Sequence, residues 1–105
     1  MGLNLTRKYS INFSLPKRLK KQIKFVIIHY TGMKKESEAI KRLCDPKAKV
    51  SSHYFISNKG IILNLVPDLY EAWHAGKSSW KDFKSLNKYS IGIEMNNPGH
   101  EYGYK

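Results

Sequence analysis

The 105-residue sequence contains few cysteines and few acidic residues, and it has no long apolar run. Its one cysteine, Cys44, excludes an internal disulfide framework and a metal site of clustered thiolates within this chain. The N-terminus "MGLNLTRKYSINFSL" lacks the apolar stretch of a signal peptide, and no later stretch approaches the length of a membrane span. These absences predict a cytoplasmic chain without a membrane span, in which Cys44 packs as a small hydrophobic side chain on a helix.

The overall composition is typical of a folded domain. Hydrophobic residues make up 41% of the chain and charged residues 26%, which argues against disorder. A chain of this length is long enough for one small domain with a modest core.

The charge is strongly positive and unevenly distributed. Nineteen Lys and Arg residues against eight Asp and Glu residues give a net charge of +11, and thirteen of the basic residues lie within positions 1–49. Such a field attracts nucleic acid, an acidic membrane surface or a carboxylate-bearing substrate without choosing among them. The stretch "LPKRLKKQIKF" (15–25) fits a polybasic anchor or a solvated connector. Charge alone, without a recognised binding module, does not favour a nucleic-acid partner.

Local patterns predict a small number of strands. The run "FVIIH" (25–29) is β-branched and aromatic, which is typical of a strand covered on both faces, and it places His29 at the strand end. The segments "HYFIS" and "IILNLV" flank "NKG" (58–60), whose glycine suits a hairpin loop. The alternation of apolar and polar residues over 9–15 indicates a further short extended segment.

One helix is predicted between these strands. Ala39, Ile40 and Leu43 recur at helical spacing over 36–44. Residues 67–87 are too rich in Gly, Ser and aromatic residues for one regular element, so we expect a long loop that is functional or mobile. A strand, a crossover helix and further strands predict an α/β or α+β fold with a mixed central β-sheet flanked by helices.

The stretch "SIGIEMNNPGH" (90–100) places an acid on a strand of small and apolar residues. Alternation puts Glu94 on the same face as Ser90, Gly92 and Asn96. If this strand neighbours 25–29, Glu94 and His29 converge on one cleft, and Gly92 leaves room there for a ligand. From the pattern alone, an exposed acid on an edge strand explains Glu94 equally well.

The sequence contains an ordered set of motifs: "IIHYTGM", "VSSHYFISNKG", "LVP", "AWHAGKSSW", "LN", "SIGIE" and "NPGHEYGY". With its flanking residues the set extends from about Ser10 to Tyr104. In this order and spacing the set resembles the zinc-dependent N-acetylmuramoyl-L-alanine amidases, with the anhydro-muropeptide amidases of cell-wall recycling as the most similar branch. Phage amidases and peptidoglycan recognition proteins share the fold. The resemblance implies a basic segment at 1–24, followed at 25–105 by the N-terminal part of one amidase domain.

The resemblance also implies roles for individual residues. His29 matches the first zinc ligand of the family, and Glu94 matches the glutamate that activates the zinc-bound water for hydrolysis of the amide between N-acetylmuramic acid and L-alanine. Four residues match positions that line the muropeptide groove: Tyr30, Ala72, Trp73 and His74. His53 matches a position that is structural rather than catalytic, and Trp80 matches an aromatic residue that packs against the groove wall.

The family takes its other zinc ligands, a histidine and an Asp or Cys, from a segment downstream of "NPGHEYGY". Only one of the three ligands therefore has a match, and His100 matches a family position that is not a ligand. We expect a truncated amidase whose sheet exposes apolar surface, and which self-associates or is completed by another chain. The alternative is a non-catalytic module that binds peptidoglycan fragments without metal.

Overall fold

The computed structural model describes residues 5–32, 35–75, 79–80 and 83–96. Their elements, in chain order, are β1 (Leu5–Arg7), β2 (Phe13–Ser14), the 3-10 helix η1 (Lys20–Gln22), β3 (Phe25–Tyr30), α1 (Glu36–Cys44), β4 (Tyr54–Ile56), β5 (Ile62–Asn64), β6 (Glu71–Ala72), β7 (Ser79–Trp80), β8 (Phe83–Lys84), the 3-10 helix η2 (Leu86–Tyr89) and β9 (Ser90–Met95).

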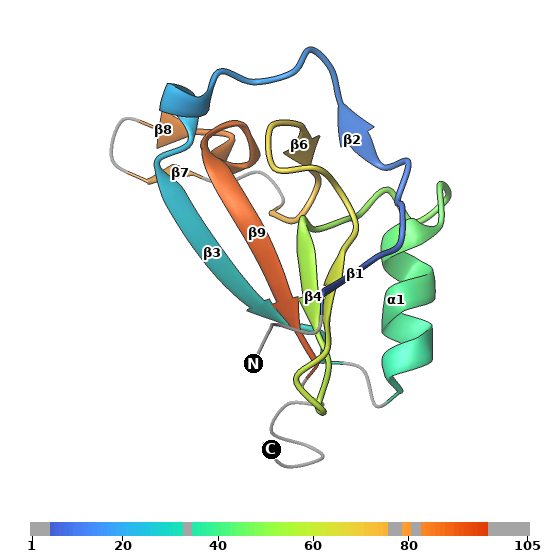
Figure 1. The fold of residues 1–105 in the computed structure, drawn as a ribbon. Coiled ribbons are helices and arrows are strands. Elements are labelled where there is room, and N and C mark those ends of the chain that lie inside the picture. Colours follow the sequence, from blue (N-terminus) through green and yellow to red (C-terminus); the bar gives the residue numbers. More distant parts are fainter. Residues whose placement is uncertain (1–4, 33–34, 76–78, 81–82, 97–105) are drawn as a thin grey trace.

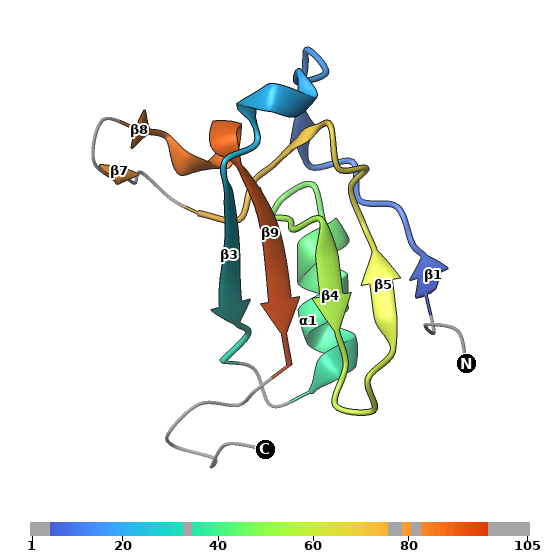
Figure 2. The ribbon, with the colours of Figure 1, turned by 60° about the vertical axis from the view of Figure 1, so that its left-hand side comes forward.

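Five strands form a mixed sheet in the order β1-β5-β4-β9-β3 (Figures 1 and 2). Strand β9 pairs in parallel with both β3 and β4, whereas β4 and β5 form an antiparallel hairpin. Gly60 takes a φ of 81° in the hairpin loop, a conformation that glycine adopts without steric cost. The predicted mixed sheet, the hairpin and the strands near 25–29 and 90–95 are confirmed.

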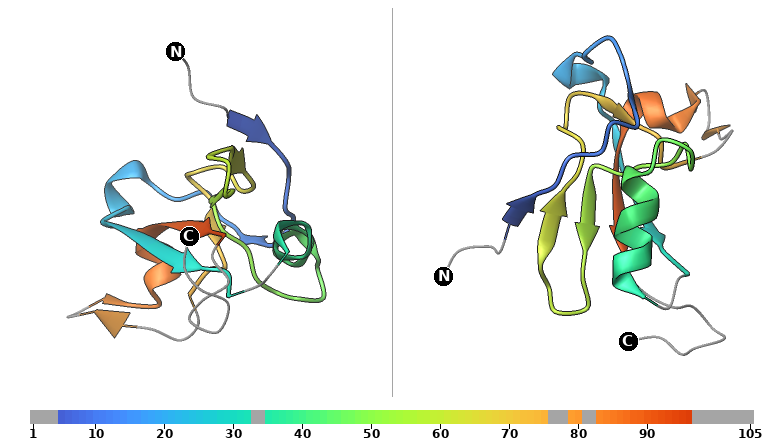
Figure 3. Two further views of the ribbon diagram at one scale, coloured as in Figure 1. Left: turned by 90° about the horizontal axis from the view of Figure 1, so that it is seen from below. Right: turned by 90° about the vertical axis from the view of Figure 1, so that its right-hand side faces the viewer.

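Helix α1 covers one face of this sheet (Figure 3). Ala39 and Leu43 project from it into a core with Phe55 and Leu65, and Cys44 packs against the same cluster. Acidic residues occupy the first turn of α1 and basic residues its last turn, which complements the helix dipole. The predicted helix and the packing of Cys44 are confirmed.

The opposite face of β3 is exposed, so the prediction of a strand covered on both faces was wrong. Val26, Ile28 and Tyr30 are 63%, 55% and 58% exposed, whereas the residues between them are half-buried on the α1 side. A continuous apolar run does not show which of its two faces a neighbouring element covers. The predicted exposure of apolar surface is confirmed.

The N-terminal segment packs against the end of α1 through polar side chains. Ser10 and Asn12 are buried, while Tyr9 and Ile11 are more than half exposed. The Ser10 hydroxyl donates to the Leu43 carbonyl oxygen at 2.6 Å, and the Asn12 side-chain amide donates to backbone carbonyls beyond the helix. Carbonyls left without partners at the helix terminus are thereby satisfied.

Residues 67–87, predicted as a long loop, contain short pieces of structure. Strand β6 pairs with β2, β7 pairs with β8, and η2 leads directly into β9. None of the helices in the described ranges is long and apolar enough to cross a membrane.

Candidate active site

The parallel pairing of β3 with β9 places His29 beside Glu94. The two residues are direct partners in the register, and they lie on the sheet face that α1 covers. Paired residues of neighbouring strands project to the same side, so the two side chains face the same region. The strand order therefore places both residues on one face, as predicted, whereas their convergence on a single cleft stays a prediction.

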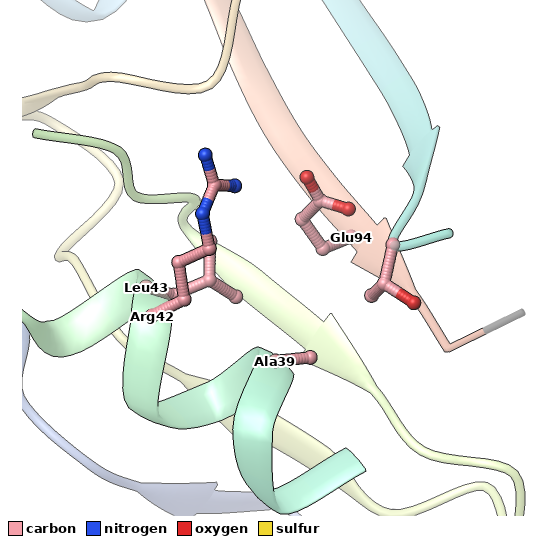
Figure 4. A pocket seen from close by; sticks show the side chains of 5 residues that line it. Ala39, Arg42, Leu43 and Glu94 are labelled. Carbon is pink, nitrogen blue, oxygen red and sulfur yellow. The ribbon is translucent and has the colours of Figure 1, made fainter. Parts of the chain in front are cut away.

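Glu94 lies on an inner strand, which removes the alternative of an exposed edge-strand acid. Its carboxylate borders a small cavity of about 20 Å³ that is lined by Thr31, Ala39, Arg42, Leu43 and Glu94 itself (Figure 4). This volume is sufficient for one water molecule. The strand pairing and α1 thus hold an acid beside a water-sized space.

The electrostatic surroundings of Glu94 disfavour its charged form. Burial raises the pKa of its carboxyl group, and the positive charge of Arg42 opposes part of this rise. The Oε2 atom is buried and has no hydrogen-bond partner among the described residues. A buried oxygen without a hydrogen-bond partner costs free energy. This atom is therefore positioned to bind a proton, a water molecule or a ligand.

His74 packs over the same sheet face, next to His29. Nδ1 of His74 lies 2.9 Å from Nε2 of His29, and the two rings meet edge to face at 5.1 Å between centroids. Burial lowers the pKa of both histidines, for His74 to about 3 with a further contribution from the neighbouring His29. Both rings are therefore neutral at physiological pH.

Gly92 creates the space that His74 fills. A Cβ atom on Gly92 would lie 2.3 Å from Cγ of His74, far closer than van der Waals contact. The prediction that Gly92 leaves room for a ligand was therefore wrong, because the ring of His74 occupies that room. The sequence of the strand showed that position 92 has no side chain. The ring that occupies the space above it belongs to a residue 18 positions earlier in the sequence.

His53 is fully buried and bonded at both ring nitrogens. Its Nδ1 accepts a hydrogen bond from the Gly92 amide at 3.0 Å, so its proton is on Nε2, which donates to the Tyr70 carbonyl at 2.7 Å. Burial lowers its pKa. These contacts match the structural role expected for His53.

The three other predicted groove residues differ in their surroundings. Tyr30 projects from β3 on the side opposite His29, and Ala72 is fully buried on β6. The indole Nε1 of Trp73 donates to the Ser14 hydroxyl at 2.7 Å. The structure thus brings His29, His74 and Glu94 to one face, but not Tyr30. The side chain of Trp80, and the whole of His100, lie outside what the structure describes.

Arg18 is a buried structural residue that the sequence did not reveal. It is buried, and its guanidinium donates to the carbonyl oxygens of Asn87 and Ser90 at 3.0 and 2.7 Å, as well as to that of Asp68. It thereby joins the N-terminal segment to the start of β9. In the sequence Arg18 is one of several neighbouring basic residues, and no local signal separates it from them.

The residues fit a zinc ion only in part. His29 can supply one imidazole, but the described residues contain no group of three His, Cys, Asp or Glu side chains that could hold a metal ion. A catalytic zinc site needs three protein ligands. The described part of the chain alone therefore does not form a complete zinc site.

Comparison with known families identifies the fold and its lineage. The family model described as N-acetylmuramoyl-L-alanine amidase matches residues 19–105. The chain belongs to this amidase family. AmiD of Escherichia coli K12, an N-acetylmuramoyl-L-alanine amidase, is 41% identical over 85 residues, which are 74% of this chain and 30% of AmiD. AmpD of Citrobacter freundii, a 1,6-anhydro-N-acetylmuramyl-L-alanine amidase, is 45% identical over 47 residues, 45% of this chain and 25% of AmpD.

Solved amidase structures show the same architecture. AmiD from E. coli, in complex with anhydro-N-acetylmuramic acid-L-Ala-D-gamma-Glu-L-Lys, superimposes with a TM-score of 0.66 at 40% identity, covering 74% of this chain and 32% of AmiD. AmpDH3 from Pseudomonas aeruginosa, in complex with anhydromuramic pentapeptide, gives 0.67 at 28% identity, covering 88% and 40%. The chain thus spans about a third of the length of AmiD, and the amidase fold predicted from its motifs is confirmed.

Proposed function

We propose that this chain contributes His29 and Glu94 to the site of an N-acetylmuramoyl-L-alanine amidase, which hydrolyses the amide between N-acetylmuramic acid and L-alanine in peptidoglycan fragments. The observation that carries the proposal is the pairing of His29 with Glu94 on adjacent parallel strands. Membership of the amidase family and the muropeptide ligands named for its solved relatives support it.

Glu94 is the proposed general base and then acid. Its raised pKa and its unpartnered Oε2 suit a carboxylate that takes a proton from a water molecule and returns it to the leaving amine. The neighbouring cavity provides space for that water. Arg42 keeps Glu94 ionisable, because its positive charge opposes the effect of burial.

Zinc is the proposed cofactor, and His29 is its proposed ligand. When bound, zinc supplies an electrophile that polarises the amide carbonyl and acidifies water. Since the described residues do not complete the site, the proposal requires further ligands from residues outside the described ranges or from another chain.

Two variants test the proposal on anhydro-muropeptide hydrolysis and zinc content. If the chain is active, Glu94→Gln should abolish turnover and leave both the fold and the bound zinc unchanged, whereas His29→Ala should lose the zinc. Lys88→Gln, a basic residue of η2, serves as the matched surface control. Normal turnover by Glu94→Gln would remove this residue from the mechanism.

A second candidate is a module that binds muropeptides without metal. The muropeptide ligands named for two solved relatives support binding by this fold. Calorimetric titration with an anhydro-muropeptide separates the two functions. Binding that is unchanged by a chelator and by His29→Ala, without any turnover, would establish the module and exclude the enzyme.

Peptidoglycan fragments are the proposed ligands, and the exposed face of β3 is the proposed surface for self-association or for a complementing chain. The exposure of Val26, Ile28 and Tyr30 supports a protein–protein contact at this face. Size-exclusion chromatography over a range of concentrations tests it, and a compact monomer without dye-binding apolar surface would contradict it. A cytoplasmic location stays a prediction.

A further inference from the structure

A hydrogen-bond chain connects the backbone of η2 to His74. The Ser90 hydroxyl donates to the Leu86 carbonyl oxygen at 2.7 Å, and the same Oγ lies 2.9 Å from Nε2 of His74. A serine hydroxyl has a single proton, and the carbonyl oxygen can only accept. Ser90 Oγ must therefore accept a hydrogen bond from His74, which places a proton on Nε2 of that ring.

This proton determines the direction of the next hydrogen bond. A neutral imidazole carries one ring proton, so Nδ1 of His74 is an acceptor. Nε2 of His29 lies 2.9 Å away and must donate to it. The proton of His29 is therefore on Nε2, and its Nδ1 keeps a free electron pair. Among the described residues, no hydrogen-bond partner is found for this Nδ1 atom.

The same contacts remove His74 from direct substrate recognition. Both of its ring nitrogens are engaged inside the protein, one by Ser90 and the other by His29. The ring also lies against the backbone of Gly92, where a side chain of any size would displace it. No hydrogen-bonding atom of the ring is left for a sugar or a peptide.

We propose that His74 is a positioning residue for His29: with Ser90 and the Leu86 carbonyl, it fixes His29 as the Nε2–H tautomer and leaves Nδ1 as the ligating or accepting atom. The benefit for the reaction rests on the proposed function, since it requires that His29 takes part in catalysis. The tautomer of His29 does not depend on the proposed function. Partners that hold the second nitrogen of a ligating histidine commonly set its tautomer and orientation.

Nuclear magnetic resonance of metal-free protein, with nitrogen-15 in the histidine rings and at mildly alkaline pH, tests the inference directly. A proton in an N–H···N bond shows one-bond coupling to its donor nitrogen and weaker coupling to the acceptor. We expect a ring proton attached to Nε2 of His29 and coupled to Nδ1 of His74. A proton attached to Nδ1 of either histidine would overturn the proposal.

Two serine variants separate the hydrogen-bond chain from simple packing. Ser90→Ala removes the acceptor for His74, and we expect loss of the coupling between the two rings. Ser52→Ala is the matched control, because Ser52 is equally buried and its hydroxyl donates to the Tyr54 carbonyl instead. Coupling of unchanged size and direction in Ser90→Ala would overturn the role of this chain.

A third variant keeps the test decisive if Ser90→Ala does not fold. His74→Phe retains a planar ring over Gly92 but cannot accept a hydrogen bond. Exchange of the His29 ring proton with water should then accelerate by about tenfold, as expected for the loss of one buried hydrogen bond. An unchanged exchange rate would show that His74 only packs.

The measurement needs neither zinc nor substrate, so it distinguishes failure of this inference from failure of the proposed function. Absence of amidase activity in a zinc-loaded protein with the expected coupling would reject the proposed function alone. Full activity in a Ser90→Ala protein that has lost the coupling would reject the positioning role alone.

Discussion

The two faces of β3 and β9 contrast sharply, although the same backbone carries both. On the α1 side β9 carries the small or polar residues Ser90, Gly92 and Glu94, and they are buried or half-buried. On the same side β3 carries His29 next to the half-buried apolar residues Phe25 and Ile27. On the other side lie large apolar residues such as Val26 and Ile28, and they are more than half exposed. The exposure of Val26 and Ile28 runs against the usual preference of apolar residues for the interior.

The difference shows what each face is built for. Buried polar groups are costly unless each has a partner, so a face that holds the hydrogen-bonded pair of His29 and His74 and a buried, unpartnered oxygen of Glu94 indicates a site rather than a core. An exposed strip of β-branched residues gains stability when it is covered, and so indicates a contact surface. The predictions that follow test this division.

The largest effect is expected for Arg18→Met, which removes the buried guanidinium at the top of the polar face. The carbonyl oxygens of Asn87 and Ser90 would lose their donor, so the free energy of unfolding should fall by about 4 kcal/mol. Urea denaturation measures this loss. Lys17→Met, at the exposed neighbouring position, is the control and should stay within about 0.5 kcal/mol. Equal effects of the two variants would show that the hydrogen bonds of Arg18 do not stabilise the fold.

Gly92→Ala should disrupt the packing of the polar face. The added methyl group overlaps the ring of His74, so we expect a loss of about 3 kcal/mol and displacement of that ring. Denaturation and the histidine resonances measure both changes. Gly60→Ala strains a left-handed residue of the hairpin loop without touching any side chain, so it should leave the histidine resonances unchanged. Wild-type stability of Gly92→Ala would show that His74 has free space around it.

The polar face should also make stability fall in acid. The pKa of each of three histidines is lowered in the folded state, for His74 from 6.5 to about 3. Their contribution is complete above about 6.5 and is lost as pH falls towards about 3, because the unfolded chain binds these protons first. The raised pKa of Glu94 acts in the opposite direction, but one carboxyl opposes three imidazoles. Unfolding of metal-free protein across this range should show the decline, and constant stability would contradict it.

The smallest effect on stability is expected on the apolar face. Ile28→Lys places a charge where the side chain is already 55% exposed, so the free energy of unfolding should change by about 0.5 kcal/mol or less. Self-association should decrease, which analytical ultracentrifugation would detect. A loss of several kcal/mol would mean that this face is covered within a single chain.

Much of the fold could be predicted because its elements depend on local patterns. Helical spacing of Ala39 and Leu43 marks α1, and the glycine at position 60 marks the hairpin loop. The placement of His29 and Glu94 on one face was also predictable, but only on the condition that their strands are neighbours. The sequence did not show whether the two strands are neighbours, because strand order depends on long-range pairing.

Other features could not be predicted because their partners are distant in the sequence. Arg18 is buried while similar residues around it are exposed, and only its carbonyl partners around positions 68–90 distinguish it. Likewise, Ser10 and Asn12 turn inwards because the end of α1 presents carbonyl groups to them.

The sequence by itself determined the elements, the positive charge and the amidase motifs, since these depend on neighbouring residues and on their order along the chain. Tertiary structure decided which face of β3 is covered, and which side chain fills the space above Gly92. It decided the proton positions of the histidines as well. These outcomes depend on contacts between segments tens of residues apart, whose geometry exists only after the sheet has assembled.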